Sequence, residues 1–323
     1  MKSMNDHSEK APRVVVLMST YNGERFLEAQ VRSILEQLPQ DGRLLVRDDG
    51  STDRTVKLLQ GFSDSRIQLK CGENLGFAKS FLTLLQQAPT DAQMVMFSDQ
   101  DDVWFPDKIE RAWRRLRAIP SGPARYCSAQ MLADEKLNPL ERTPAWPRPP
   151  SFIGAMAENI VTGCTAALNT EAANLLREGG VPEQVHFHDW WMYLVIAAFG
   201  TVVVDDEPTL LYRQHGGNLI GRGAGWWGRH LQILRFLLKN DWVGIMLGQI
   251  AELQSLYGGR LSPEQRRILF RHFVVRDNLA KPKWRTVLGG TRWRQTWANE
   301  VFFRILLVTK RTGIWPPFWR RPN

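Results

Sequence analysis

The amino-acid sequence predicts an α/β fold, in which a mostly parallel sheet is flanked by helices and followed by a helical, basic C-terminal appendage. Two observations support this fold class. Short apolar runs alternate with segments of helical period over about the first 120 residues. Basic residues and tryptophans then gather in the last third of the chain.

The alternation predicts four strands and four helices in order. The first strand is a short β-branched run, as expected of a strand buried on both faces. The first helix has apolar residues at a helical period and ends before Pro39, whereas Pro106 sits where a helix start tolerates it. The strands are predicted at 13–20, 43–50, 67–72 and 93–100, and the helices at 23–38, 51–62, 76–88 and 106–119.

The rest of the predicted catalytic region is less regular. Residues 120–150 are enriched in Pro and Gly, which predicts a surface loop that is able to act as a mobile lid over the site. Residues 201–218 predict a strand, a break at Pro208, a short strand and a polar loop. Between these segments we expect a short helix at 152–160, a strand or turn at 161–169, and helices at 170–180 and 185–200.

Polar clusters follow each of the first four predicted strands. They occupy residues 19–22, 48–49, 74 and 99–101. Ligands of parallel α/β sheets bind at the carboxyl ends of the strands. Four polar clusters at one edge therefore predict a binding site there.

Three carboxylates end the fourth strand: Asp99, Asp101 and Asp102. Acids gathered this closely repel one another, and a divalent cation would offset the cost. Mg²⁺ and Mn²⁺ prefer carboxylate oxygen and often keep substrate phosphates as further ligands. Asp99 and Asp101 therefore predict a metal that holds a diphosphate. The alternative is a solvated acidic turn in which Asp102 or Asp107 caps the next helix.

The composition indicates in which cellular compartment the protein is expected to reside. The polar N-terminus has no signal-peptide core and the chain has no run of 18 apolar residues, so neither export nor a conventional transmembrane helix is expected. Three widely spaced cysteines indicate free thiols in a reducing cytoplasm and argue against a cysteine zinc site.

Charge divides the chain near residue 221. The last part, 221–323, holds 19 of the 42 basic residues, only five of the 33 acids, and eight of the 13 tryptophans. We expect a disordered N-terminus at 1–12, a catalytic domain at 13–220 and a helical region at 221–323. The stretches 225–247 and 300–321 suit interfacial helices on an anionic membrane surface. A bundle packed on the catalytic domain is the alternative, and nucleic-acid binding is disfavoured because no such motif appears.

Six motifs occur in order, namely TYNGERFLEAQVRSIL, VRDDGSTDRT, ENLGFAKSF, FSDQDDVW, HDWWMYL and YRQHGGN. Together they resemble the inverting family 2 glycosyltransferases, and most of all the rhamnosyltransferase group, over about residues 13–220. The resemblance implies a GT-A (Rossmann-like) fold, a nucleotide-sugar donor and sugar transfer. The chain lacks the QxxRW motif and the transmembrane bundle of the processive members, so single-sugar transfer is expected.

The resemblance places the donor nucleotide at the loops that follow the strands. Asp48 or Asp49 would accept a hydrogen bond from the pyrimidine ring, with Asp49 preferred. Asp49 and Ser51 are alternatively a turn and helix cap, and both roles can coexist. Glu24 would lie near the ribose. Lys79 would either meet the diphosphate or be a solvated helix residue. The implied donor residues are Thr20, Tyr21, Asn22, Glu24, Asp48, Asp49, Asn74, Gly76, Lys79, Ser98 and Asp99.

The resemblance also implies the catalytic and metal residues. Asp99, Asp101 and His215 would hold Mg²⁺ or Mn²⁺. Asp189 matches the catalytic carboxylate, the general base that takes the proton of the acceptor hydroxyl. A helix N-cap is the alternative for Asp189, and His188 would support it or simply be exposed. The implied acceptor and sugar residues are Asp102, Trp104, Gly163, His188, Trp190, Trp191 and Arg213, with the two adjacent tryptophans as an apolar platform or as core.

We therefore expect a metal-dependent inverting glycosyltransferase, peripheral on the inner face of a bacterial plasma membrane. The expected donor is dTDP-rhamnose. The expected acceptor is a polyprenyl-diphosphate-linked glycan of a surface polysaccharide such as O-antigen or exopolysaccharide. One alternative is a UDP-hexose (glucose or galactose) transferase of the same family. The other is a non-catalytic basic adaptor for nucleic acid or membrane.

Overall fold

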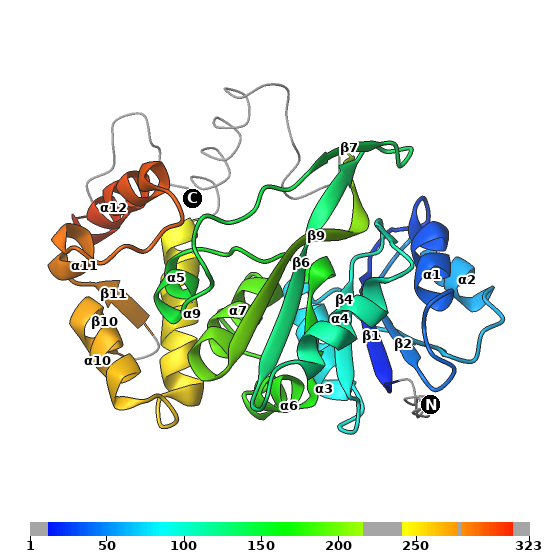
Figure 1. Ribbon diagram of the computed structural model, residues 1–323, viewed down its shortest axis with the longest axis horizontal. Coiled ribbons are helices and arrows are strands. Elements are labelled where there is room, and N and C mark those ends of the chain that lie inside the picture. The colour runs from blue at the N-terminus through cyan, green and yellow to red at the C-terminus, as the bar shows by residue number, and fades with distance from the viewer. Residues whose placement is uncertain (1–11, 216–240, 277–278, 313–323) are drawn as a thin grey trace, which may run out of the picture.

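A computed structural model describes residues 12–215, 241–276 and 279–312 (Figure 1). All of the predicted disordered N-terminus except Pro12 lies outside these residues. The strands are β1 (Val14–Thr20), β2 (Arg43–Asp48), β3 (Ile67–Cys71), β4 (Met94–Ser98), β5 (Val103–Trp104), β6 (Ala124–Ala133), β7 (Pro139–Arg142), β8 (Ala167–Asn169), β9 (Thr201–Arg213), β10 (Phe273–Arg276) and β11 (Leu279–Pro282). The helices are α1 (Leu27–Leu35), α2 (Thr55–Gln60), α3 (Phe77–Gln87), α4 (Lys108–Arg117), α5 (Phe152–Ala157), the 3-10 helix η1 (Gly163–Thr165), α6 (Thr170–Glu178), α7 (His188–Phe199), α9 (Trp242–Tyr257), α10 (Pro263–His272), α11 (Trp284–Leu288) and α12 (Trp297–Thr312).

A nine-stranded sheet forms the centre of the described chain, in the order β3-β2-β1-β4-β8-β6-β9-β5, with β7 paired to β6. β1 pairs in parallel with β2 and β4, and β2 pairs in parallel with β3. This confirms the predicted α/β sheet and all eight elements expected before residue 120. Beyond β4 the sheet is mixed, because β8 runs antiparallel to both β4 and β6.

Helices cover both faces of the sheet, and β1 shows why its sequence is apolar without alternation. Successive side chains of a strand point to opposite faces. Val14, Val16 and Met18 pack with α1 and α4, whereas Val15 and Leu17 pack with α3, α6 and α7. Both faces of β1 therefore pack in the core over residues 14–18, and all five of these residues are apolar.

Two strands contradict the sequence prediction. The segment 120–150 is not one loop, because its residues 124–133 form β6, a strand inside the sheet with Tyr126 fully buried. Prolines and glycines flank β6 without interrupting it, so the composition of the whole segment hid the strand. Pro208 likewise does not break β9, because the register of β9 against β6 shifts at this point and a bulge accommodates the proline.

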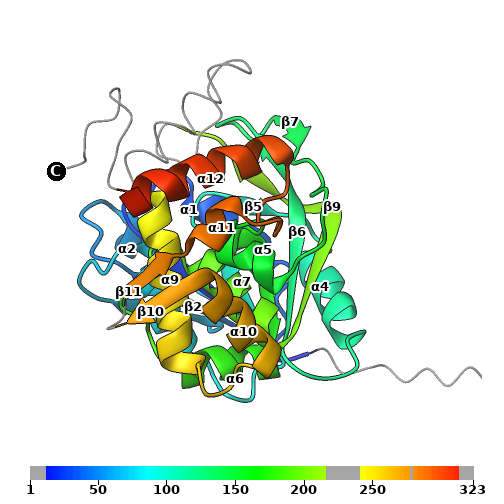
Figure 2. The same cartoon turned by 90° about the vertical axis from the view of Figure 1, so that its left-hand side faces the viewer.

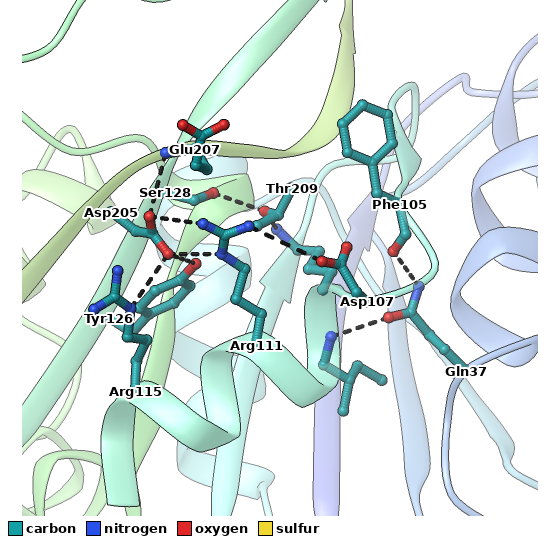
Figure 3. Close-up of polar contacts among 12 residues, drawn as sticks. Gln37, Phe105, Asp107, Arg111, Arg115, Tyr126, Ser128, Asp205, Glu207 and Thr209 are labelled. Carbon is teal, nitrogen blue, oxygen red and sulfur yellow. Dashed lines mark hydrogen bonds and ion pairs between the residues drawn. The ribbon is translucent and has the colours of Figure 1, made fainter. Parts of the chain in front are cut away.

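A polar network ties α4 to β6 and β9 around the buried carboxylate of Asp205 (Figure 3). Arg111 donates to both carboxylate oxygens, at 2.7 and 3.0 Å, and the hydroxyl of Tyr126 donates at 3.1 Å. Burial by itself raises the pKa of Asp205, but the hydrogen bonds from Arg111 outweigh it and bring the pKa to about 2. The network fixes α4, whose first residue is Lys108, against the sheet.

The described C-terminal part is not a separate unit. Helices α9 and α12 share one hydrophobic core with α3, α5, α6 and α7, and Trp242 stacks on Trp190 of α7 with ring centroids 4.5 Å apart. Residues 242–247, which the sequence placed in an interfacial helix, belong mainly to this core. Residues 225–240 of that stretch, and residues 313–321 of the second one, lie outside the described residues. None of the helices in the described ranges has the length and apolarity that a membrane crossing requires.

We predict that Asp205→Ala lowers the free energy of unfolding by about 3 kcal/mol, because it leaves the guanidinium of Arg111 partly buried without its partner. The neighbouring Asp206 is exposed and serves as the matched control. Asp206→Ala should change stability by about 0.5 kcal/mol or less. Urea denaturation of both variants tests this, and equal stability of the two would contradict it.

Candidate active site

The carboxyl ends of β1, β2, β3 and β4 meet at one edge of the sheet. Thr20 at the end of β1 lies opposite Asp48 at the end of β2, and Met18 lies opposite Ser98 at the end of β4. Because the strands are parallel, the loops that follow them are neighbours. The predicted gathering of polar clusters at a single edge is therefore correct.

Asn22 joins the loop after β1 to the loop after β2. Its φ of +47° lies in the left-handed region, which asparagine tolerates better than most residues. Its backbone N–H donates to the hydroxyl of Ser51 at 2.8 Å, and its side-chain oxygen accepts from the backbone N–H of Thr52 at 2.9 Å. Asn22 thus links the two loops at the site. Its side-chain oxygen is already used in a hydrogen bond within the protein.

Asp48 and Asp49 are both buried and both bonded within the protein. Asp48 accepts from Thr20 at 3.0 Å and from the backbone and hydroxyl of Ser51 at 2.9 and 2.5 Å. Asp49 forms an ion pair with Arg47 and accepts from the backbone N–H groups of Leu75 and Gly76 at 3.0 and 2.8 Å. Each carboxylate already accepts three hydrogen bonds from the protein, which leaves one lone-pair site for a pyrimidine ring.

The expected donor residues divide into exposed and buried groups. Tyr21 is 49% exposed, and its backbone is held by Gln100 through bonds of 2.9 and 3.0 Å. Asn74, Gly76 and Lys79 are also exposed. Thr20 and Ser98 are not available as predicted, because both are buried and bonded to the protein.

Glu24 has a local partner as well. Its carboxylate accepts from the backbone N–H of Arg54 at 2.8 Å and from the guanidinium of the same residue at 3.1 Å. Glu24 therefore satisfies an N–H at the start of α2. Contact with a ribose would compete with this bond.

The acids after β4 repel one another, as the sequence suggests. Burial, together with the charges of Asp101 and Asp189, raises the pKa of Asp99 to about 7. Burial and the charges of Asp101 and Asp99 also raise the pKa of Asp102 well above its usual range. Asp102 is fully buried and accepts from the backbone N–H of Arg213 at 3.2 Å. It points into the protein, so the expected role of Asp102 in orienting a donor sugar is wrong.

The three expected metal ligands are only partly brought together. His215 Nε2 lies 2.7 Å from Asp101 Oδ2, whereas Asp99 groups with Asp102 and the thiol of Cys164, all within 4.8 Å. Burial raises the pKa of Cys164 well above its usual range, so this thiol stays neutral and suits neither Mg²⁺ nor Mn²⁺. The carboxylate of Asp101 and the imidazole of His215 fit a divalent cation, and Asp99 lies two residues before Asp101 in the chain.

Lys108 is a buried cation that the sequence analysis did not single out. Its side chain is fully buried, with Nζ 3.1 Å from the hydroxyl of Thr209 and 4.9 Å from the centre of the Trp104 ring. Burial lowers the pKa of Lys108 to about 8, although nearby Cys164, Asp102 and Asp99 act to raise it. Lys108 supplies positive charge behind the acidic strand end. No motif marks it, because it reads as one more basic residue of an amphipathic helix.

Asp189 lies in the first turn of α7, partly exposed and within electrostatic range of Asp99. Its backbone carbonyl accepts from the guanidinium of Arg125 at 2.6 Å. Arg125 is fully buried in β6, and two of its nitrogens have no partner within the described residues. The sequence analysis missed Arg125 because it falls in the segment that was predicted to be a loop. Arg125 fixes the start of α7 and places a positive charge beneath Asp189.

His188 is neither exposed nor suited to act as a base. Its ring is buried and stacks on Phe81, with ring centroids 4.3 Å apart. Burial lowers its pKa to about 4, and neither ring nitrogen has a hydrogen-bond partner within the described chain. A Cβ on Gly163 would lie 2.6 Å from Nε2 of this ring, so glycine is required there for close packing. Gly163 therefore helps to position α7 and is itself buried.

The three expected tryptophans of the acceptor side belong to the core. Trp190 is fully buried and donates its indole N–H to the carbonyl of Ala155 at 2.7 Å. Trp191 and Trp104 are also buried. The expected sugar platform is therefore wrong, and Trp190 and Trp191 pack as core. Arg213, another of the expected acceptor and sugar residues, donates to the backbone carbonyl of Asp101 at 2.7 Å and lies over the ring of Phe26.

Comparison with known proteins agrees with this architecture. Residues 15–170 match the model of Glycosyl transferase family 2. S. aureus TarS in complex with UDP-GlcNAc is similar in structure, with a TM-score of 0.54 at 15% identity, over 94% of this chain and 93% of that one. A mannosyltransferase of Pyrobaculum calidifontis in complex with GDP-Man and Mn²⁺ gives a TM-score of 0.52 at 19% identity, over 94% and 88% of the two chains. The chain therefore has the GT-A fold, and its residues 15–170 form a family 2 glycosyltransferase region.

Two relatives are informative about the particular enzyme. The chain is 27% identical over 240 residues to a dTDP-rhamnosyl transferase of Shigella flexneri, covering 70% of this chain and 80% of the relative. It is 38% identical over 98 residues to a UDP-Glc:α-D-GlcNAc-diphosphoundecaprenol β-1,3-glucosyltransferase of Escherichia coli, covering 30% of this chain and 38% of that protein. The protein is thus a glycosyltransferase with a rhamnosyltransferase relative, and the non-catalytic adaptor is excluded.

The buried His188 predicts an acid sensitivity of the fold. The unfolded chain takes a proton on this ring below pH 6.5, whereas the folded protein takes it only near pH 4, so stability falls as the pH drops between these values. The loss amounts to about 3 kcal/mol across this window. His188→Leu should remove this part of the pH dependence, and His186→Leu, at an exposed position two residues earlier, should keep it. Urea denaturation at several pH values tests the slopes, and equal slopes in wild type and His188→Leu would contradict the prediction.

Proposed function

We propose that the protein transfers a single sugar, with inversion, from a nucleotide-sugar to a lipid-linked oligosaccharide of a bacterial surface polysaccharide. The donor we favour is dTDP-rhamnose. The relative named for dTDP-rhamnosyl transfer aligns over 70% of this chain, whereas the one named for UDP-Glc aligns over 30%. A UDP-hexose donor is the second candidate, supported by the higher local identity of that shorter alignment.

One observation carries the proposal. A partly exposed carboxylate, Asp189, stands at the first turn of α7 beside the acidic end of β4. The two sides of a displacement reaction need different groups, and this arrangement supplies both. Asp189 lies on the acceptor side, and Asp99 and Asp101 lie on the side of the donor diphosphate.

In the proposed reaction, Asp189 accepts the proton of the acceptor hydroxyl while the oxygen of that hydroxyl attacks the anomeric carbon of the donor sugar. The bond between this carbon and the diphosphate oxygen breaks, and the nucleoside diphosphate leaves with the electron pair. Arg125 holds the backbone carbonyl of Asp189, and Oδ1 of the Asp189 side chain accepts from the backbone N–H of Trp190 at 2.7 Å. Asp101 and His215, with Asp99 two residues before Asp101, would hold Mg²⁺ or Mn²⁺, which would supply positive charge for the departing diphosphate.

The loops after β1 and β3 would receive the nucleotide. Tyr21 offers an exposed ring on which a base can stack, and Lys79 offers an exposed cation. The acceptor is anchored in a membrane by its polyprenyl chain. We accordingly place the enzyme at the inner face of the plasma membrane, as a peripheral protein.

Release of nucleoside diphosphate from a panel of dTDP-rhamnose, UDP-glucose and UDP-galactose, with Mn²⁺ and a lipid-linked acceptor extract, tests the donor. We expect dTDP-rhamnose to give the fastest release. Preferred turnover of a UDP-sugar would establish the second candidate. Failure of all three donors would overturn both.

Asp101→Ala is expected to abolish metal-dependent turnover and to leave the fold intact, since Asp101 is partly exposed. The change removes the carboxylate that contacts His215. Asp91→Ala, at an exposed acid before the start of β4 and so at the other end of that strand, is the control and should retain wild-type activity. Turnover of Asp101→Ala at the wild-type rate in EDTA would rule out a role in metal binding.

Asp189→Asn is expected to keep donor binding and to lower turnover by roughly 10² or more, because the amide cannot accept the proton. Glu171→Gln provides a matched control, since Glu171 is also a first-turn acid, on α6. Donor binding is measured by thermal shift, because a ligand that binds only the folded state raises its stability. Wild-type turnover of Asp189→Asn would reduce Asp189 to a helix-capping role.

A further inference from the structure

One end of the molecule gathers exposed apolar side chains. The elements α10, β10, β11, α11 and α12 lie together on the side that faces the viewer in Figure 2. More than half of the large apolar side chains that are exposed in the described residues lie on these five elements. We call this surface the C-terminal face, and its apolar residues are Phe270, Val274, Leu279, Trp284, Leu288, Trp297, Val301 and Ile305.

Helix α12 has an apolar side that folding does not use. Trp297, Val301 and Ile305 are spaced by four residues and so lie on one side of the helix. They are 67%, 59% and 50% exposed, whereas Phe303 and Leu307 on the other side are buried in the core. The inner side of the helix packs in the hydrophobic core. The exposed outer stripe can contact an apolar surface outside the described chain.

The C-terminal face also carries a basic hollow. Its volume is about 680 Å³, and it is lined by Arg267, Phe270, Arg271, Lys283 and Arg285, with no acidic residue among them. In the part of the chain that the structure describes, the three arginines form no ion pair with any carboxylate. Their charge is therefore available to an anion from outside the protein.

Aromatic and basic groups also alternate at the edges of the face. The guanidinium of Arg292 lies 4.6 Å from the ring centre of Trp297, and that of Arg311 lies 4.9 Å from that of Trp284. Tryptophan favours the boundary between lipid tails and head groups, and arginine favours the phosphates beside it. Two exposed tryptophans, each with an arginine over its ring, suit that boundary.

We propose that the C-terminal face docks on an anionic phospholipid bilayer, with lipid phosphates in the basic hollow and the α12 stripe inserted at shallow depth. A nucleic acid would satisfy the arginines but would leave Val301 and Ile305 without an apolar partner. A second copy of this strongly basic face would repel the first. An anionic lipid surface satisfies both the charge and the apolar stripe.

The inference deepens the proposed function, because it says which surface brings the enzyme to a membrane-anchored acceptor. Vesicle binding is measured with the full chain in the absence of donor and acceptor. Loss of binding and loss of sugar transfer are therefore separate results, and either proposal can fail alone.

Co-sedimentation with vesicles of phosphatidylcholine, with and without phosphatidylglycerol, tests the charged part. We expect binding to the anionic vesicles to weaken about tenfold in Arg267→Gln/Arg271→Gln, because both residues line the hollow. Lys57→Gln/Lys70→Gln removes the same charge from exposed positions on α2 and β3, and should change binding less than about twofold. Equal binding of the two double variants would overturn the assignment of the hollow.

The apolar part is tested at about 0.5 M NaCl, where exposed charges are largely screened. We expect the wild type to retain some binding there and Trp297→Ser/Ile305→Ser to lose it. Both residues are exposed, so the unfolding midpoint of this variant should stay at the wild-type value. Salt-resistant binding that survives the double change would overturn the role of the stripe.

Two further results would overturn the proposal as a whole. One is a DNA 20-mer that binds with dependence on Arg267 and Arg271 while anionic vesicles do not bind. The other is a dimer, seen by light scattering, that Trp297→Ser/Ile305→Ser converts to monomer, because the face would then be a contact between copies of this chain.

Discussion

Crowding of carboxylates at the end of β4 is the constraint on which the rest of the site depends. Asp99 and Asp102 cannot both be ionised in a buried setting without nearby positive charge. Lys108 from α4 supplies that charge from below, and the backbone N–H of Arg213 bonds Asp102 from β9. The position of α4 in turn rests on the Arg111–Asp205 ion pair. A distant part of the sheet thus holds the acidic edge in place.

The first half of the fold was predictable because its signals are local. Each strand from β1 to β4 is a short apolar run, and each following helix repeats at a helical period. The second half was less predictable because its pairing is long-range. β6 lies between β8 and β9, which come two and three strands later in the chain, so no local pattern separates it from the prolines around it. The bulge that accepts Pro208 depends equally on a partner strand that sequence alone does not reveal.

The position of the site was predictable, but the direction of individual side chains was not. Parallel strands bring their ends together whatever the side chains do, so the edge that carries Asp48, Asn74 and Asp101 followed from topology. In the loop after β4, two adjacent side chains point in different directions. Asp101 reaches His215 at the surface, whereas Asp102 turns inward to Arg213. The same limit explains Trp190, which a motif places beside Asp189 and which helical geometry turns into the core.

The stack of Trp242 on Trp190 has a consequence for how this enzyme can vary. The helix whose first turn carries the proposed base is packed from that turn onward against helices from the other end of the chain. A chimera joined between β9 and α9 would therefore have to match two halves of one apolar core, and most exchanges would leave an indole facing water. New acceptor preferences are accordingly easier to reach by changing surface residues of α9–α12 than by replacing the whole C-terminal part. The catalytic half and the C-terminal half are bound to diverge together.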